Sequence, residues 1–258
     1  MHSYPDGPDP TEERSLLRIQ ARVAWFMRML TTINVGERPP VPPGPAIHAA
    51  NHRSMADLLL STCTFSTWGW PIRPLVAVSY FEQPLIGWLL RQLRCIPVEG
   101  TEALDLAAEA LRDGWSIAIM PEGRIVPEEE WAETGVGRSH QGIGRLAIDT
   151  GLPVVANGAS GTERLWPRGR SLPFFRPWRR VPLVLRSEVV GVVDAERPRE
   201  ATDEIMAAVV RCVATSDRIA GRTVRPPTAG ERSTPVVTVP VVVHQDQVVG
   251  MGVVGVVT

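Results

Sequence analysis

Residues 46–57, Ala-Ile-His-Ala-Ala-Asn-His-Arg-Ser-Met-Ala-Asp, contain the change from strand to helix on which the predicted fold depends. The apolar start, residues 46–50, predicts a short strand, and Asp57 begins a helix that continues to about Phe65. On a regular helix, five positions turn through about 500°, which would separate the side chains of His52 and Asp57. We therefore place His52 in the loop that enters the helix and Asp57 in the first turn of that helix.

The pair His52 and Asp57 has two interpretations. A neutral imidazole accepts a proton near neutral pH, and a neighbouring carboxylate holds its tautomer and stabilises the imidazolium. The same run also contains Ser54-x-x-Asp57 ahead of three leucines, the pattern of a capping box that opens a buried helix. We interpret His48 as a strand residue rather than a second base. The run alone leaves both interpretations of His52 and Asp57 open.

Strands and helices alternate outward from this run. Further strands are predicted at residues 73–78, 95–98, 115–120, 152–156 and 181–193, and helices at 83–93, 102–112, 142–150 and 198–220. Such alternation predicts one α/β domain, residues 47–220, in which helices flank a largely parallel mixed sheet. Ligands gather at the carboxyl ends of the strands in such sheets. Because His52 and Glu122 each follow a strand, we expect them to meet at one edge.

The ends of the chain differ from this domain. Residues 1–10 are predicted to be a disordered tail, residues 37–46 a proline-rich linker, and residues 221–258 a valine-rich tail of low complexity to which we assign no function. Between them, residues 11–36 predict an amphipathic helix, with apolar residues at helical spacing up to Ile33 and a stripe of Arg14, Arg18 and Arg22. Such a helix fits either an anchor on an anionic membrane surface or a helix packed against its own domain.

Composition excludes several classes of protein. A chain of 258 residues with a formal net charge of −1 and 44% hydrophobic residues is typical of a globular protein, not of a nucleic-acid binder. All 27 basic residues are arginine, whose planar cation suits phosphate and carboxylate. The three cysteines, Cys63, Cys95 and Cys212, support neither a disulfide framework nor a metal site. No stretch approaches the ~20 apolar residues of a membrane-spanning helix.

Several blocks together indicate a family. Asn51-His52-x-x-x-x-Asp57 is followed in order by Met120-Pro121-Glu122-Gly123-Arg124 and by Gly151-Leu152-Pro153-Val154-Val155, with residues 80–90 and 94–98 between them. Together these blocks resemble the glycerolipid acyltransferases of the lysophosphatidic acid acyltransferase type, over roughly residues 45–190. The resemblance implies transfer of a fatty acyl group from acyl-CoA or acyl carrier protein to the hydroxyl of a lysophospholipid such as 1-acylglycerol-3-phosphate, in phosphatidic acid biosynthesis. No cofactor is expected.

The resemblance and the chemistry together assign catalytic roles. His52 is the candidate general base and Asp57 its orienting partner, so that the acceptor hydroxyl attacks directly without an acyl-enzyme. We expect backbone N–H groups at the start of the helix after His52 to stabilise the oxyanion.

Six further residues are expected to contact substrate. Asn51, Arg53 and Ser54 flank His52. Gly123 allows close approach of a ligand, and Arg124 is the candidate for the phosphate of the acceptor, because guanidinium binds phosphate at two points. Glu122 is expected to position Arg124 or an acceptor hydroxyl.

Three departures from the family pattern leave the acceptor open. No threonine stands between Gly123 and Arg124, Gly100 replaces the arginine that closes the second block, and Val78 and Ser79 stand where a lysine is common. Other interpretations are therefore a different lipid acceptor, a catalytically silent lipid-binding module, or a thioesterase-like hydrolase in which His52 activates water.

A second arginine-rich segment, residues 164–186, interleaves arginines with Trp166, Phe174, Phe175 and Trp178. We interpret it as a surface for lipid head groups, with a solvated basic face as the alternative. With the amphipathic helix, it leads us to expect a peripheral protein on the cytoplasmic face of the cell membrane.

Overall fold

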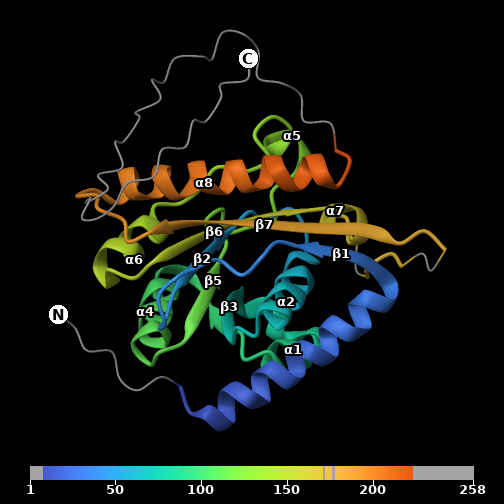
Figure 1. Ribbon diagram of the computed structural model, residues 1–258, viewed down its shortest axis with the longest axis horizontal. Helices are drawn as coiled ribbons and strands as arrows, with labels where there is room; N and C mark the ends of the chain where they lie inside the picture. The colour runs from blue at the N-terminus through green and yellow to red at the C-terminus, as the bar shows by residue number, and fades with distance from the viewer. Residues whose placement is uncertain (1–7, 171, 176–177, 223–258) are drawn as a thin grey trace, which may run out of the picture. The chain divides into compact units, whose positions relative to one another are not determined.

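A mixed seven-stranded sheet forms the centre of the protein (Figure 1). The computed structural model describes residues 8–170, 172–175 and 178–222, and these fall in one compact unit. The predicted tail at 223–258 and most of the predicted tail at 1–10 lie outside the described residues. The strands are β1 (Thr31–Val35), β2 (Ile47–Ala50), β3 (Ile72–Ala77), β4 (Ile96–Val98), β5 (Ser116–Ile119), β6 (Val154–Ser160) and β7 (Val181–Gly191).

The sheet is largely parallel. Its strand order is β1-β7-β6-β2-β5-β3-β4; only the pairing of β6 with β7 is antiparallel, and β1 runs parallel to β7. The predicted α/β fold with a largely parallel mixed sheet is confirmed. β2 lies between β5 and β6, so the loops that follow β2 and β5 leave the same edge of the sheet.

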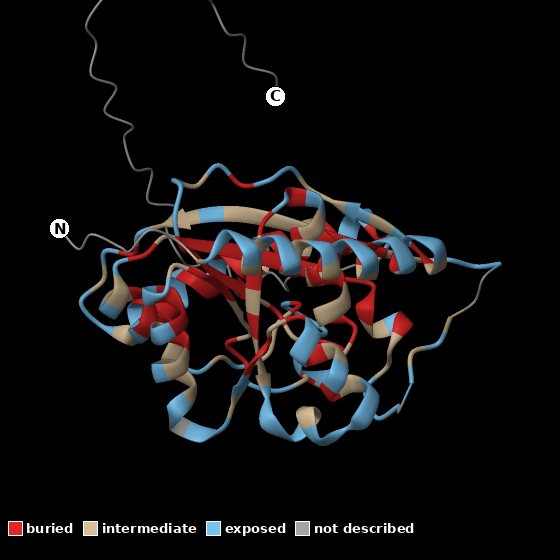
Figure 2. Ribbon diagram, turned by 90° about the horizontal axis from the view of Figure 1, so that it is seen from below, coloured by how far each residue is buried: buried red, intermediate tan, exposed pale blue. Residues whose placement is uncertain are grey.

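Helices cover both faces of the sheet (Figure 1). One core cluster joins α4 (Ala103–Arg112), α6 (Gly142–Thr150) and α8 (Pro198–Ile219) to β2, β5 and β6. A second cluster joins α1 (Pro10–Leu30) and α2 (Asp57–Trp68) to the other face. Buried segments are concentrated between these layers (Figure 2). The remaining helices are η1 (Val78–Glu82), α3 (Pro84–Gln92), η2 (Gly100–Glu102), α5 (Glu128–Trp131) and α7 (Thr162–Leu165).

The structure corrects the end of the first helix. We predicted helix over residues 11–36, but α1 ends at Leu30 and residues 31–35 form β1, an edge strand paired with β7. The sequence Thr-Thr-Ile-Asn-Val is rich in β-branched residues, which pack well in strands, and pairing with β7 satisfies its backbone. The predicted linker at 37–46 contains no helix or strand.

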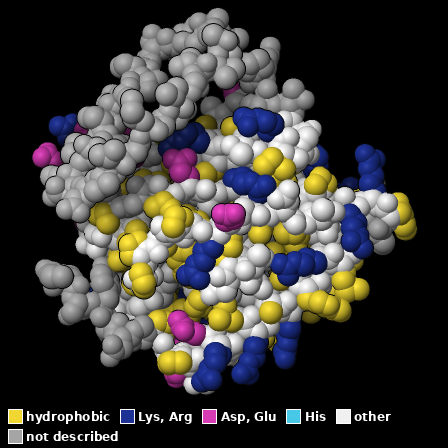
Figure 3. Space-filling model, in the orientation of Figure 1, with side chains coloured by type: hydrophobic (Ala, Val, Ile, Leu, Met, Phe, Trp, Pro, Cys, Tyr) yellow, Lys and Arg dark blue, Asp and Glu magenta, His cyan; other side chains and the backbone are white. Residues whose placement is uncertain are grey.

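α1 has two different faces. Leu16, Ala24 and Met27 are buried, and the helix packs along α2, as the packed alternative predicts. The opposite face exposes Trp25 and Met29, which are 65% and 53% accessible. Figure 3 shows hydrophobic and arginine side chains together along the edge that α1 forms. α1 is therefore part of the folded domain and also presents apolar side chains to its surroundings. None of the helices in the described residues is long and apolar enough to cross a bilayer.

Candidate active site

His52 and Asp57 lie in contact where β2 gives way to α2. His52 occupies the loop after β2, and Asp57 is the first residue of α2. The Nδ1 atom of His52 lies 2.9 Å from Oδ2 of Asp57. The side chain of His52 is 20% exposed, whereas that of Asp57 is only 1% exposed. An imidazole held at Nδ1 by a buried carboxylate leaves Nε2 to act on a substrate.

The carboxylate of Asp57 also organises its surroundings. Oδ2 accepts hydrogen bonds from the backbone N–H groups of Arg53 (2.8 Å) and Ser54 (2.9 Å), and Oδ1 accepts one from the hydroxyl of Thr162. The bond to Ser54 is half of the predicted capping box, so one carboxylate serves both interpretations of the run. Thr162 gave no sequence signal, because it lies on α7, far along the chain.

These bonds use three backbone donors that lie close to the oxyanion site expected at the start of α2. The N–H groups of Arg53 and Ser54 point at Asp57, and that of His52 donates to Glu122. The first backbone donors after the strand therefore bind carboxylates of the protein itself, and they are not available to a substrate oxygen.

Glu122 has a different role from the one expected. Glu122 is only 1% exposed. Its carboxylate accepts hydrogen bonds from the backbone N–H of His52 and, at 2.8 Å, from the backbone N–H of Gly137. The expectation that it positions Arg124 or an acceptor hydroxyl is wrong, because both oxygens bind backbone. Burial raises the pKa of Glu122, although the hydrogen bonds from Gly137 and His52 oppose the rise. Glu122 thus fastens the loop after β5 to the loop that carries His52.

Asn51 and Ser54 are framework residues rather than cavity residues. The amide of Asn51 donates to the carbonyl of Ala159 (3.1 Å) and accepts from its N–H (2.8 Å). Oγ of Ser54 lies 2.9 Å from the carbonyl oxygen of Thr162 and 2.7 Å from that of Trp166. Both side chains are fully buried, and neither lines the cavity described below. The structure does not place them where a substrate would contact them.

Arg53 is likewise turned away from the cavity. Its guanidinium forms a two-point ion pair with Asp217 on α8, at 2.8 and 2.9 Å, and donates to the carbonyl of Gly135 at 2.9 Å. It also lies over the ring of Trp131, 4.1 Å from the centroid. With 2% exposure it cannot reach a substrate. The expected substrate contact is replaced by a tie between the His52 loop and α8.

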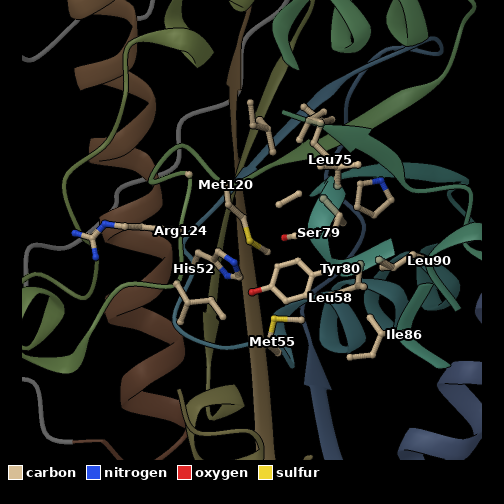
Figure 4. A pocket seen from close by; sticks show the side chains of 18 of the residues that line it. His52, Met55, Leu58, Leu75, Ser79, Tyr80, Ile86, Leu90, Met120 and Arg124 are labelled. Carbon is tan, nitrogen blue, oxygen red and sulfur yellow. The ribbon is translucent and has the colours of Figure 1, made fainter. Parts of the chain in front are cut away.

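Gly123 and Arg124 do reach the cavity. Gly123 adopts a φ of +66°, which favours glycine, in the turn after β5. Arg124 lines the cavity, but Figure 4 shows its guanidinium pointing away from the other lining side chains. There it forms an ion pair with Glu130. Its positive charge is thus already compensated by a neighbour.

His48 is a strand residue, as predicted, and its side chain lies in the core. It is buried between the rings of Phe65 and Trp70, whose centroids lie 4.7 and 4.6 Å from its own. Burial, with a smaller effect of the Arg38 charge, lowers its pKa to about 3. His48 therefore stays neutral and takes no part in the site.

A cavity of about 1000 Å³ opens beside His52. Its walls are mostly apolar and come from the start of α2, β3, η1, α3 and the ends of β4 and β5. Leu58, Leu75 and Leu90 lie along it, and the hydroxyl of Tyr80 points toward His52 (Figure 4). The residues from Trp166 to Arg170 line it as well. A base beside a large and mostly apolar cavity is suited to activating a hydroxyl next to a hydrocarbon chain.

Comparisons with known proteins agree with this arrangement. The family model described as Acyltransferase matches residues 32–159. A 1-acyl-sn-glycerol-3-phosphate acyltransferase from chloroplasts of Brassica napus is 23% identical over 160 residues, which are 60% of this chain and 44% of that protein. The chain thus spans less than half the length of this relative.

A solved structure shares the fold. The crystal structure of the 1-acyl-sn-glycerophosphate acyltransferase PlsC from Thermotoga maritima superposes with a TM-score of 0.62 at 20% identity, over 83% of this chain and 81% of that one. This likeness extends the family match to a three-dimensional arrangement of sheet and helices.

Glu122→Gln tests the buried carboxylate. Because its pKa is raised in the folded protein, the folded state holds this proton more tightly than the unfolded chain. The stability due to Glu122 is then greatest at low pH and is lost as the pH rises through the raised pKa. The free energy of unfolding of the wild type, minus that of Glu122→Gln, should fall as the pH rises above about 4.5, the ordinary pKa of this carboxyl group. Urea unfolding at several pH values measures it.

The matched control is Glu129→Gln, an exposed carboxyl on α5. The difference in the free energy of unfolding between the wild type and Glu129→Gln should not change over the same range of pH. If the difference between the wild type and Glu122→Gln were also independent of pH, that result would contradict the raised pKa of Glu122.

Proposed function

Because this chain belongs to the acyltransferase family of the 1-acyl-sn-glycerol-3-phosphate acyltransferase type, we propose that it transfers a fatty acyl group from a thioester to the hydroxyl of a lysophospholipid. The donor in this proposal is acyl-CoA or acyl carrier protein, and the acceptor is a molecule such as 1-acylglycerol-3-phosphate. No cofactor takes part. The observation that carries the proposal is the position of His52, held by Asp57, beside a large apolar cavity.

The cavity suits an acyl chain. Each methylene that leaves water for an apolar wall contributes about 0.8 kcal/mol, so a fatty chain binds here without any specific polar contact. The polar group at the end of the chain then lies at His52. This places the reacting carbonyl or hydroxyl beside the base.

The reaction in this proposal is a direct transfer. The acceptor hydroxyl gives its proton to Nε2 of His52 as its oxygen attacks the thioester carbonyl, and Asp57 stabilises the imidazolium through Nδ1. The tetrahedral intermediate then collapses, the carbon–sulfur bond breaks, and the proton passes from Nε2 to the departing thiolate. The ester and the free thiol leave, and His52 is again neutral.

Tyr80 is the donor that we assign to the oxyanion. The backbone N–H groups of residues 52–54 are bound to Asp57 and Glu122, so these three donors are not free for a substrate oxygen. The hydroxyl of Tyr80 approaches from the opposite wall and points toward His52 (Figure 4). A phenol O–H aimed at the position where charge develops stabilises the transition state more than the ground state.

His52→Ala should abolish transfer without unfolding the protein. Loss of a general base lowers the rate by about 10²–10⁴-fold. Thioester consumption is measured with and without lysophospholipid, and the lipid products are identified. The control is His140→Ala, an exposed histidine outside the cavity lining.

Three results would contradict the proposal. Near-normal transfer by a folded His52→Ala protein would show that His52 is not the general base. Thioester consumption that needs no acceptor would indicate a hydrolase, and no consumption by the wild type would indicate a silent lipid-binding module.

Tyr80→Phe should lower kcat by about 10²-fold, the effect of losing one oxyanion donor, and leave the KM of both substrates nearly unchanged. Steady-state kinetics with each substrate varied measures it. Ser79→Ala, which removes another hydroxyl from the same cavity, is the matched control. A larger loss in Ser79→Ala than in Tyr80→Phe would transfer the role to Ser79.

The proposal includes a peripheral location on the cytoplasmic face of the cell membrane. Trp25, Phe26 and Met29 are exposed at the end of α1, and the ring of Phe26 lies edge-on to that of Phe175, 6.4 Å away. Exposed aromatic side chains beside arginines are typical of surfaces that enter the interface of an anionic bilayer. Removing all residues before Arg38 would not test this, because it would also remove β1 from the sheet.

The double variant Trp25→Ser with Met29→Ser should weaken binding to anionic vesicles, since it removes apolar area that is already exposed and leaves the core intact. Co-sedimentation with vesicles of phosphatidylglycerol and phosphatidylcholine measures binding. Val192→Ser, also an exposed apolar residue at 62%, is the control. Equal binding by the double variant and the wild type would place the membrane contact elsewhere.

A further inference from the structure

Positive charge is distributed unevenly around the cavity. Three arginines line it, Arg124, Arg168 and Arg170, and its acidic lining residue is Glu99. Arg124 is paired with Glu130. Neither Arg168 nor Arg170 forms an ion pair with any residue that the structure describes. The uncompensated charge therefore belongs to the two arginines that follow α7.

The segment that carries these arginines is fastened to the catalytic loop. Oγ of Ser54 lies 2.7 Å from the carbonyl oxygen of Trp166. The indole N–H of Trp166 donates to the carbonyl of Arg170 at 2.8 Å, and the N–H of Arg170 donates to Pro167 at 3.2 Å. The hydrogen bond from Ser54, which is two residues after His52 in the chain, thus links this turn to the loop that carries the base. The arginine backbone is thus held at a fixed position relative to the base.

The other walls of the cavity offer no equivalent. Val78, Ser79 and Gly100 line it without a charge, and Glu99 beside them is negative. An anion that enters the cavity would find free positive charge only on the side of Arg168 and Arg170, among the described residues. The guanidinium of Arg170 also lies 5.5 Å from the ring centroid of Phe174, which limits its freedom.

We propose that Arg168 and Arg170 bind the phosphate of the acceptor's head group and so select a phosphate-bearing lysolipid. Guanidinium groups bind phosphate at two points, and such charge-assisted bonds are the strong ones. The acyl chain of the acceptor then lies along the apolar wall and its hydroxyl reaches Nε2 of His52. This inference rests on the proposed function and adds to it the residues that bind the phosphate of the head group.

The test is the double variant Arg168→Ala with Arg170→Ala. Its matched control is Arg179→Ala with Arg180→Ala, which removes the same charge from exposed residues of the same segment that do not line the cavity. Acceptor and donor KM are measured in neutral detergent micelles, so that attraction to an anionic bilayer plays no part. The acceptors are 1-acylglycerol-3-phosphate and the uncharged 1-acylglycerol.

We expect the first variant to raise the KM of the phosphate-bearing acceptor roughly tenfold or more and to leave those of the uncharged acceptor and of the donor unchanged. Arg168→Lys with Arg170→Lys should recover part of the loss, since an ammonium keeps the charge but not the two-point contact. An unchanged KM for the phosphate-bearing acceptor would overturn the inference. So would an equal rise in the control, or an equal rise for the uncharged acceptor.

Direct binding separates this inference from the proposed function. If the wild type transfers no acyl group, the proposed function fails. Titration calorimetry with 1-acylglycerol-3-phosphate in the same micelles still decides the role of the arginines. Weaker binding by Arg168→Ala with Arg170→Ala than by the control supports the inference, and equal binding by the two variants overturns it.

Discussion

The carboxylate of Asp57 is the group on which the rest of the site depends. It accepts hydrogen bonds from the imidazole of His52, from the backbone N–H groups of Arg53 and Ser54, and from the hydroxyl of Thr162. A buried carboxylate is costly unless its oxygens are satisfied, and here every donor also fixes a piece of the site. The loop after β2, the start of α2 and α7 are joined at one side chain. The geometry of His52 follows from that junction.

Further buried polar groups continue the hydrogen-bond network of Asp57. We call this network, which includes Asp57, Glu122 and Arg53, the frame of the site. Glu122 ties the His52 backbone to the loop after β5, and Arg53 pairs with Asp217, which also accepts from Ser160. Removing one partner of such a pair leaves an uncompensated buried charge, which is strongly destabilising, while the intact pair adds little net stability. These pairs therefore account for a precise geometry better than for a high stability.

The sequence predicted the fold and the central pair because both depend on local patterns. Alternating strands and helices, and the spacing from His52 to Asp57, can be recognised within a few residues. β1 was missed because its pairing with β7, and not the helical pattern that precedes it, decides its conformation. The sequence does not reveal hydrogen-bond partners that come from distant parts of the chain. Three residues were therefore assigned to substrate although they bind protein groups: Arg53 binds Asp217, Ser54 binds Thr162, and Glu122 binds the backbone of Gly137. The sequence also does not show that the N–H groups of Arg53 and Ser54 are bound to Asp57.

The division between frame and cavity wall explains why departures from the family pattern are tolerated. Val78, Ser79 and Gly100 lie on the wall of the cavity, and none of them contacts Asp57 or Glu122 through a hydrogen bond. A change at the wall alters the shape and charge that a substrate meets, while the base and its carboxylate keep their geometry. A change in the frame would instead leave a buried donor or acceptor unsatisfied, at a cost of about 1–3 kcal/mol for each group. Selection of a different acceptor can therefore proceed along the wall without disturbing the acid–base pair.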